Sequence, residues 1–215
     1  MPKRFLAPVV LVGLALNAAG LSQPDKPAAA PAWPKQVAKE LYADEFRGKK
    51  APEFLVEDFI TPKPDMKGRV VLIDFWATWC GPCRKAIPEL NEIQAKFKDD
   101  LVVVGVSDES PATVVKFMEK TQIKYTSAID TQARMKKAVN VRGIPHVIII
   151  STDGIVRWQG FPLSDDEPLT AAIVKQVIDA DPGVKARRAA KAAEKPGDKP
   201  VEKPADKPTE APKKP

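Results

Sequence analysis

The chain has 215 residues, which is enough for one ordinary domain with further segments at its ends. Its formal net charge is +6, but residues 27–181 carry 21 basic and 22 acidic residues, so the positive excess belongs to the two ends. A nucleic-acid-binding domain, which needs a basic face, is therefore not expected. Two cysteines are also too few for a multi-disulfide scaffold.

Residues 1–21 have the pattern of an export signal. Lys3 and Arg4 form a short basic start, and an apolar run follows from Phe5 to Leu16. The run is too short to span a bilayer comfortably and small residues follow it, so cleavage is expected, with an uncleaved anchor as the alternative. The protein is therefore predicted to be extracytoplasmic, in the periplasm or associated with the envelope.

The segment between the export signal and the first buried strand has few sequence patterns that indicate a particular structure. Residues 22–47 are predicted to be a linker rich in Pro and Ala, with a helix from Gln36 to Phe46 at its end. An extended entry strand is expected from Ala51 to Phe59, and a loop with two prolines follows it.

Two apolar runs predict buried strands at Val70–Phe75 and Leu101–Val106. Between them, apolar residues recur at steps of three and four and predict a helix from Pro82 to Lys98. Further helices are expected at residues 110–121, 131–138 and 167–180, and further strands at residues 125–128, 147–151 and 155–158. Strands alternate with helices early and a hairpin comes late, which predicts an α/β fold with a mixed central sheet flanked by helices.

From residue 182 the composition changes to an acid-Lys-Pro repeat without any apolar periodicity. Such a segment cannot build a core, so residues 182–215 are predicted to be a disordered Lys/Pro-rich tail.

Both cysteines lie in the segment Trp79-Cys80-Gly81-Pro82-Cys83, where a buried strand gives way to a helix. Cys80 is expected at the helix N-terminus, where unpaired N–H groups and the helix dipole lower the pKa of a thiol. Cys83 lies one turn further and is expected to be more shielded. The pattern predicts a redox-active pair, with an exposed attacking sulfur and a resolving sulfur. A structural staple is the alternative, although a bridge that closes so short a loop constrains the unfolded chain little.

Two segments far apart in the chain resemble the thioredoxin superfamily. Residues Asp74–Ala77 with the cysteine motif resemble its active-site segment, and Val141–Pro145 resembles the loop that faces that site. Gly48–Phe54 and the export signal are similar to the TlpA/ResA-like extracytoplasmic branch. The resemblance implies a thioredoxin-like domain over residues 48–181. A peroxidatic site is not expected, because the Pro and Thr of the peroxiredoxin pattern are replaced here by Ile73 and Ala77.

The resemblance implies roles for individual residues. Cys80 and Cys83 would be the catalytic cysteines, and Asp74 would be the buried acid of the family. Burial should raise the pKa of Asp74 toward neutrality, where a general base for Cys83 works best. A carboxyl group with a purely structural role is the alternative for Asp74.

The same resemblance implies a substrate-binding surface. Trp79 would form its rim, the backbone of Ile144 would pair with the substrate chain, Pro145 would be a cis proline, and Gly160 would let a partner approach closely. His146 follows the proline and is considered as a group that tunes the thiols, with a packed histidine as the alternative.

The predicted function is reduction of disulfides in exported proteins, because the Gly-Pro dipeptide between the cysteines resembles reducing thioredoxins. A disulfide oxidase or isomerase on the same fold and a non-catalytic envelope-binding module are the alternatives. By analogy with the family, a membrane thiol transporter would supply electrons. No cofactor or metal is expected, since two cysteines and one histidine do not make a structural zinc site. The protein is expected to be a monomer.

Overall fold

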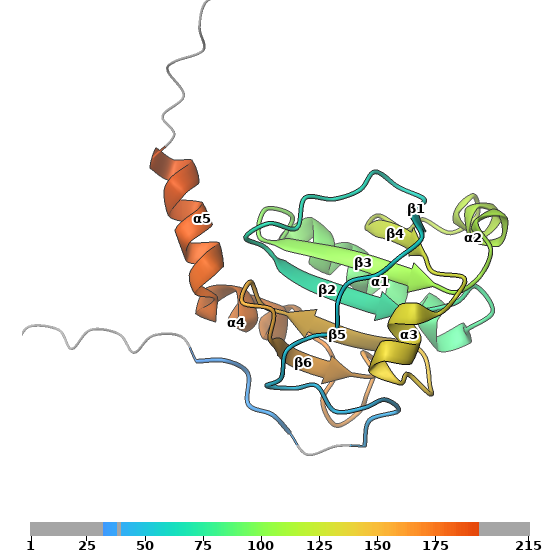
Figure 1. The fold of residues 1–215 in the computed structure, drawn as a ribbon, viewed down its shortest axis with the longest axis horizontal. Coiled ribbons are helices and arrows are strands. Elements are labelled where there is room, and N and C mark those ends of the chain that lie inside the picture. Colours follow the sequence, from blue (N-terminus) through green and yellow to red (C-terminus); the bar gives the residue numbers. More distant parts are fainter. Residues whose placement is uncertain (1–31, 38–39, 194–215) are drawn as a thin grey trace, which may run out of the picture. The chain divides into compact units, whose positions relative to one another are not determined.

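The computed structural model describes residues 32–37 and 40–193 (Figure 1). The chain divides into two units, residues 1–30 and 31–215, and all described residues belong to the second. The predicted export signal and the last 22 residues of the predicted tail, 194–215, lie outside the described residues.

A six-stranded mixed sheet forms the centre of the domain, with the strand order β1-β4-β3-β2-β5-β6. β2, β3 and β4 run parallel to one another, whereas β1, β5 and β6 are each antiparallel to their neighbours. The strands are β1 (Asp58–Phe59), β2 (Val70–Phe75), β3 (Leu101–Ser107), β4 (Thr126–Ile129), β5 (His146–Ile150) and β6 (Val156–Gly160). The predicted mixed sheet is confirmed.

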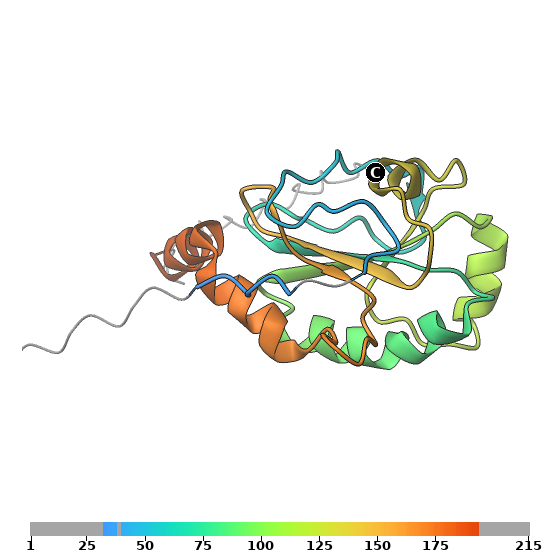
Figure 2. The ribbon, with the colours of Figure 1, turned by 90° about the horizontal axis from the view of Figure 1, so that it is seen from below.

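Helices cover both faces of this sheet (Figure 2). α1 and α4 lie on one face, and α3 lies on the other with the chain that precedes β2. The helices are α1 (Gly81–Lys96), α2 (Pro111–Met118), α3 (Arg134–Val139), α4 (Ala171–Ala180) and α5 (Pro182–Ala193). The first four lie close to their predicted positions.

Strand β2 divides its side chains between two cores. Val70 and Leu72 pack with the apolar faces of α1 and α4, whereas Ile73 and Phe75 pack with α3. Successive side chains of a strand point to opposite faces, so Asp74 lies on the α1 side. Both faces are covered, which explains why the strand is apolar almost throughout.

The predicted helix from Gln36 to Phe46 is wrong for the described residues of that range, which have no helical structure. The backbone of this segment bonds to other parts of the fold: the Asp44 amide donates to Val139 O (3.0 Å), and Tyr42 O accepts from the Arg142 amide (2.7 Å). These tertiary bonds replace the intrahelical ones. The predicted entry strand is also shorter, because only Asp58–Phe59 pairs with β4.

The prediction that disorder begins at residue 182 is wrong for the first twelve residues, which form α5. Asp181 is fully buried and accepts hydrogen bonds from the amides of Gly183 (2.8 Å) and Val184 (3.1 Å) in the first turn. It also accepts from the amide of Thr152 (2.7 Å), which ties α5 to the turn between β5 and β6. Asp before Pro182 is a helix-start signal that the Lys/Pro composition obscured.

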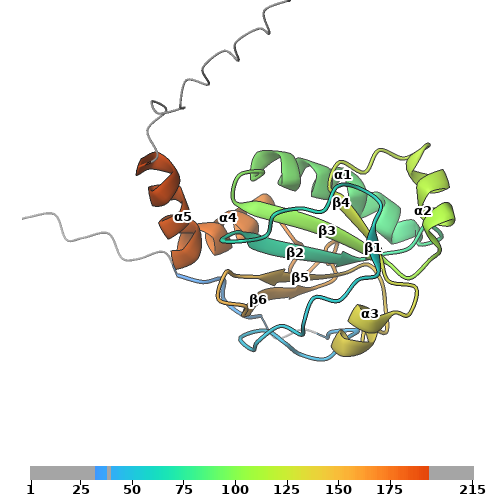
Figure 3. The ribbon, with the colours of Figure 1, turned by 45° about the horizontal axis from the view of Figure 1, so that its top comes forward.

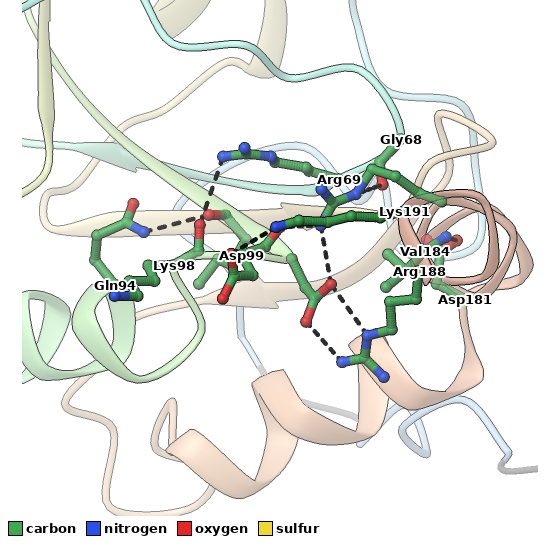
Figure 4. A network of polar contacts seen from close by, with 12 residues as sticks. Gly68, Arg69, Gln94, Lys98, Asp99, Asp181, Val184, Arg188 and Lys191 are labelled. Atoms are coloured by element: carbon green, nitrogen blue, oxygen red, sulfur yellow. Dashed lines mark hydrogen bonds and ion pairs between the residues drawn. The ribbon is translucent and has the colours of Figure 1, made fainter. Parts of the chain in front are cut away.

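Basic side chains of α5 hold the helix against the loop that precedes β3 (Figure 4). Arg188 binds Asp100 through two contacts of 2.6 and 3.1 Å, and Arg187 binds the same carboxylate at 3.0 Å. Arg187 also donates to Gly68 O at 3.1 Å. The hydrogen bonds that the Asp100 carboxylate accepts from Arg188 lower the pKa of Asp100 below its ordinary value. The α5 helix is therefore fixed to the domain by charge as well as by the buried Val184.

We expect Asp100→Asn to lower the free energy of unfolding by about 1–2 kcal/mol at neutral pH, because two arginines lose their charged partner. Because the pKa of Asp100 is lowered in the folded protein, its carboxylate stabilises the fold at pH values above the unfolded-state pKa of about 3.9. This contribution is lost as the pH falls through the folded-state pKa. The melting temperatures of the two proteins should therefore converge in acid. Asp99→Asn is the matched control, since the Asp99 side chain is 67% exposed. An equal effect of both substitutions would contradict this role of Asp100.

Candidate active site

The two cysteines lie at the N-terminus of α1 and form a disulfide, with their Cα atoms 5.2 Å apart. Cys80 is the N-cap residue, and its Sγ accepts a hydrogen bond from the Cys83 amide at 3.1 Å. Pro82 in the first turn suits a helix start. In the reduced protein, the same amide and the helix dipole would stabilise a thiolate on Cys80.

Exposure distinguishes the two sulfurs less than the sequence predicted. Cys80 is 3% exposed and Cys83 is 1% exposed, so both residues are buried in the disulfide form. The difference between them is one of position: Cys80 caps the helix, whereas Cys83 lies within its first turn.

The loop before β5 faces the disulfide. The carbonyl oxygen of Ile144 lies 3.7 Å from Cys80 Sγ, and the Ile144–Pro145 peptide bond is cis. Trp79, directly before Cys80, is 69% exposed. Gly160 ends β6 and pairs with Val147, just after the proline. These residues come from three separate parts of the chain. Trp79 is next to Cys80 in sequence, whereas the fold brings Ile144 to Cys80 from the loop before β5.

Asp74 is a buried acid on the same side of the sheet as α1. The residue is 1% exposed, and burial raises the pKa of Asp74 to about 7. The Tyr125 hydroxyl donates to Oδ2 across a long 3.5 Å, and Oδ1 has no hydrogen-bond partner among the described residues. Its neighbour in β3, Gly105, has no side chain, and Trp76 and Tyr125 occupy that space. The carboxyl group can therefore take up and release a proton near neutral pH.

His146 has a structural position. It follows the proline, but its side chain packs beside Phe75 on the α3 side of the sheet, opposite Asp74. The Gln159 amide faces His146 Nε2 at 3.0 Å. Gln159 Oε1 accepts from the Phe46 amide and Nε2 donates to Asp44 O, so its orientation is fixed and His146 Nε2 is the acceptor. His146 thus helps to hold the N-terminal segment.

Glu109 is not among the predicted site residues, and it supports the loop that carries Trp79 and Cys80. Its carboxylate accepts from the Thr78 amide at 2.6 Å and from the Thr78 hydroxyl at 2.7 Å. A usable signal existed: Thr78 and Glu109 follow the ends of β2 and β3, and the carboxyl ends of adjacent parallel strands meet at one edge of a sheet.

In residues 32–37 and 40–193, no group of three or more His, Cys, Asp and Glu side chains could hold a metal ion. None of the helices in these residues has the length and apolar character needed to cross a bilayer.

Comparison with known proteins places the chain in a family. A model of the AhpC/TSA family matches residues 47–159, more than half of the chain. The chain belongs to the AhpC/TSA family. The match contains Asp74, both cysteines, the proline loop and Glu109, so the whole candidate site except Gly160 lies inside it.

Individual relatives of this AhpC/TSA chain bear names that refer to thiol chemistry. Thiol-disulfide oxidoreductase ResA of Bacillus thuringiensis subsp. konkukian is 36% identical over 114 residues, which are 51% of this chain and 66% of ResA. The chain therefore matches just under two thirds of that relative. Thioredoxin-like protein YneN of Bacillus subtilis is 31% identical over 117 residues, with coverage of 51% and 68%.

Solved structures confirm the thioredoxin-like fold. A Chlorobium tepidum protein, named as a candidate thiol:disulfide interchange protein DsbE, superposes with a TM-score of 0.53 and 34% identity. The match covers 62% of this chain and 96% of that one. The resemblance stated from the two sequence segments is thus confirmed at the level of fold and family.

The raised pKa of Asp74 predicts an unusual dependence of stability on pH. Because the folded protein binds the Asp74 proton more tightly than the unfolded chain, the fold is most stable below the unfolded-state pKa of about 3.9. The free energy of unfolding then falls as the pH rises from that value through about 7. At about 1.4 kcal/mol for each pKa unit, the penalty approaches about 4 kcal/mol at alkaline pH. We expect Asp74→Asn to be more stable than the parent near pH 8, with the advantage disappearing toward pH 4. Thermal unfolding across this range measures it, and a constant difference would contradict the raised pKa.

Proposed function

We propose that the protein is a thiol–disulfide oxidoreductase that reduces disulfide bonds in other proteins through Cys80 and Cys83. The observation that carries this proposal is the Cys80–Cys83 disulfide at the N-terminus of α1, with Cys80 Sγ 3.7 Å from the Ile144 carbonyl oxygen. A redox-active sulfur at such a position combines a stabilised thiolate with a facing loop that can hold a substrate chain. The likeness to ResA supports the same chemistry.

The reaction begins with the reduced protein. The Cys80 thiolate attacks one sulfur of the substrate disulfide, which forms a mixed disulfide and releases the other substrate sulfur as a thiolate. Cys83 then loses its proton and attacks Cys80 Sγ. The second substrate thiol leaves, and the Cys80–Cys83 disulfide forms. Two electrons pass to the substrate, and an external dithiol must return them to the protein.

Asp74 is proposed as the base for the second step. Both cysteines are buried, but Cys83 lies within the first turn and lacks the N-cap position that stabilises a thiolate on Cys80, so burial favours its protonated form. A carboxyl group with a pKa of about 7 is deprotonated in a large fraction of molecules at neutral pH and still binds a proton well. Its place on the α1 side of β2 supports this role.

The substrate-binding residues remain as proposed from the family. The Ile144 backbone would pair with an extended substrate segment, and Pro145 would keep this loop without a competing amide donor. Trp79 would cover the bound segment from the exposed side, and Gly160 would allow its close approach. This recognition uses main-chain groups, which suits a reductase with more than one substrate.

We propose that the protein works outside the cytoplasm, on exported proteins that contain disulfides. The basic start and apolar run within residues 1–21 support this location. A membrane thiol transporter would return electrons to Cys80 and Cys83, and the protein would act as a monomer. The thioredoxin-like domain would span residues 48–181, and α5 follows it and contacts Asp100 through Arg188.

A trapping experiment tests the function. Cys83→Ser should reduce a protein disulfide halfway and remain joined to it through Cys80, whereas Cys80→Ser should trap nothing. The parent should reduce insulin with dithiothreitol as electron source, and its reduction potential should lie near about −270 mV rather than about −120 mV. Absence of both turnover and trapped complexes would overturn the proposal, and the higher potential would favour an oxidase.

The proposed base predicts a specific defect in the second step. Asp74→Asn should slow the release of substrate from a preformed Cys80 mixed disulfide by at least about tenfold, because proton transfer of this kind contributes about 10²–10⁴-fold. Alkylation of Cys80 in the reduced variant should stay close to the parent rate. Single-turnover release is measured from pH 6 to 8, with the exposed Asp65→Asn as control. Release at the parent rate would mean that Asp74 has only a structural role.

A further inference from the structure

The N-terminal residues 40–46, here called the strap, lie against the loop that faces the cysteines (Figure 3). Figure 3 shows this blue segment passing beside β6 and α3. The Arg142 amide donates to Tyr42 O at 2.7 Å, and Gln159 binds both Asp44 O and the Phe46 amide. The strap is thus attached to the substrate loop and to the sheet by separate bonds, and the cysteine motif takes no part in these bonds.

Tyr42 lies directly on the loop. A Cβ atom added at Gly143 would come within 3.1 Å of Tyr42 Cβ and 3.3 Å of its Cγ, so the tyrosine packs against the bare backbone of this glycine. Tyr42 is nevertheless 56% exposed. A large aromatic side chain is therefore held one residue away from Ile144 with much of its surface facing solvent.

A cavity of about 400 Å³ lies between the strap and the loop. Glu40, Leu41 and Tyr42 form its strap side, and Ile144, Pro145 and Phe161 contribute from the loop and from the residue after β6. Because Ile144 and Pro145 line it, the cavity is continuous with the place where a substrate chain would bind.

The charges in this cavity favour a cation. Arg142 also lines it, but its guanidinium donates to Leu41 O (3.2 Å) and Ala43 O (3.3 Å) and pairs with Asp44 at 3.5 Å. Glu40 is exposed and forms no hydrogen bond or ion pair within the described residues. The uncompensated charge is therefore negative, and it lies in a cavity that also contains two aromatic rings.

We propose that this cavity is a subsite for a basic side chain, lysine or arginine, close to the disulfide cysteine of the substrate. Glu40 would pair with the cation, and the Tyr42 and Phe161 rings would contact its apolar stem and its charge. The inference rests on the proposed function, because it assigns specificity to the same site. Tyr42 and Glu40 are then specificity-determining residues that lie before the segment matched by the family model.

The experiment uses short peptides with one cysteine, joined by a disulfide to a chromogenic thiol, with Lys, Gln or Glu at positions flanking the cysteine. Each rate is divided by the rate of the same enzyme variant with hydroxyethyl disulfide, which has no flanking residues. We expect a preference for Lys over Gln of about three- to tenfold in kcat/KM, which weakens as salt is added. Glu40→Gln and Tyr42→Ala should each lose most of it.

Two control variants test whether the loss of the preference for Lys is specific to Glu40 and to the aromatic ring of Tyr42. Tyr42→Phe should retain the preference, and so should Glu92→Gln, which removes an exposed charge from α1. Equal rates for all peptides, a preference unchanged in Glu40→Gln, or a preference for Glu would each overturn the subsite. If the parent also fails to reduce hydroxyethyl disulfide, the proposed function itself fails, so the two failures are distinguishable.

Discussion

Strand β2 is covered on both faces, and this burial governs what its single charged residue can do. Ile73 and Phe75 fill the core under α3, while Val70 and Leu72 fill the core under α1 and α4. Asp74 lies on the same face of β2 as Val70 and Leu72 and has one weak hydrogen bond, from Tyr125. Desolvation of the carboxylate outweighs this hydrogen bond and raises the pKa of Asp74 to about 7. The strand that anchors the sheet thus also supplies a group suited to proton transfer.

The same strand delivers the cysteines to one edge of the sheet. β2 ends at Phe75 and α1 begins at Gly81, so the connecting loop carries Trp79 and Cys80 at the carboxyl end of the parallel strands. Glu109, which follows β3, fixes this loop through Thr78, and the loop before β5 meets it from the other side. The site is therefore built from loops that rigid strands hold in place.

Segments outside the central elements are attached to this framework by polar contacts. The strap bonds to the substrate loop and to Gln159, and α5 bonds to Asp100 and to the turn at Thr152. The strap places Glu40 and Tyr42 in the same cavity as Ile144. Both residues lie before the segment that the family model matches, so family members with a different N-terminal segment would lack them. Specificity on a common fold can vary in this way without change to the reacting sulfurs.

Elements whose information is local could be predicted from the amino-acid sequence alone. Continuous apolar runs identified β2 and β3, and the step of three and four residues identified α1. The position of the cysteine motif between the first run and this helical pattern located Cys80 at the helix start. Burial of Asp74 followed from the same apolar strand. Local structures that depend on partners distant in the chain emerge only from the fold. The strap is not a helix because Val139 and Arg142 take its backbone bonds, and α5 is ordered because Asp181 and Asp100 bind it. His146 likewise acquires its role from Gln159, a neighbour remote in the chain, which no local pattern encodes. Glu109 follows a predicted strand, but only the parallel pairing of β2 with β3 brings it to Thr78.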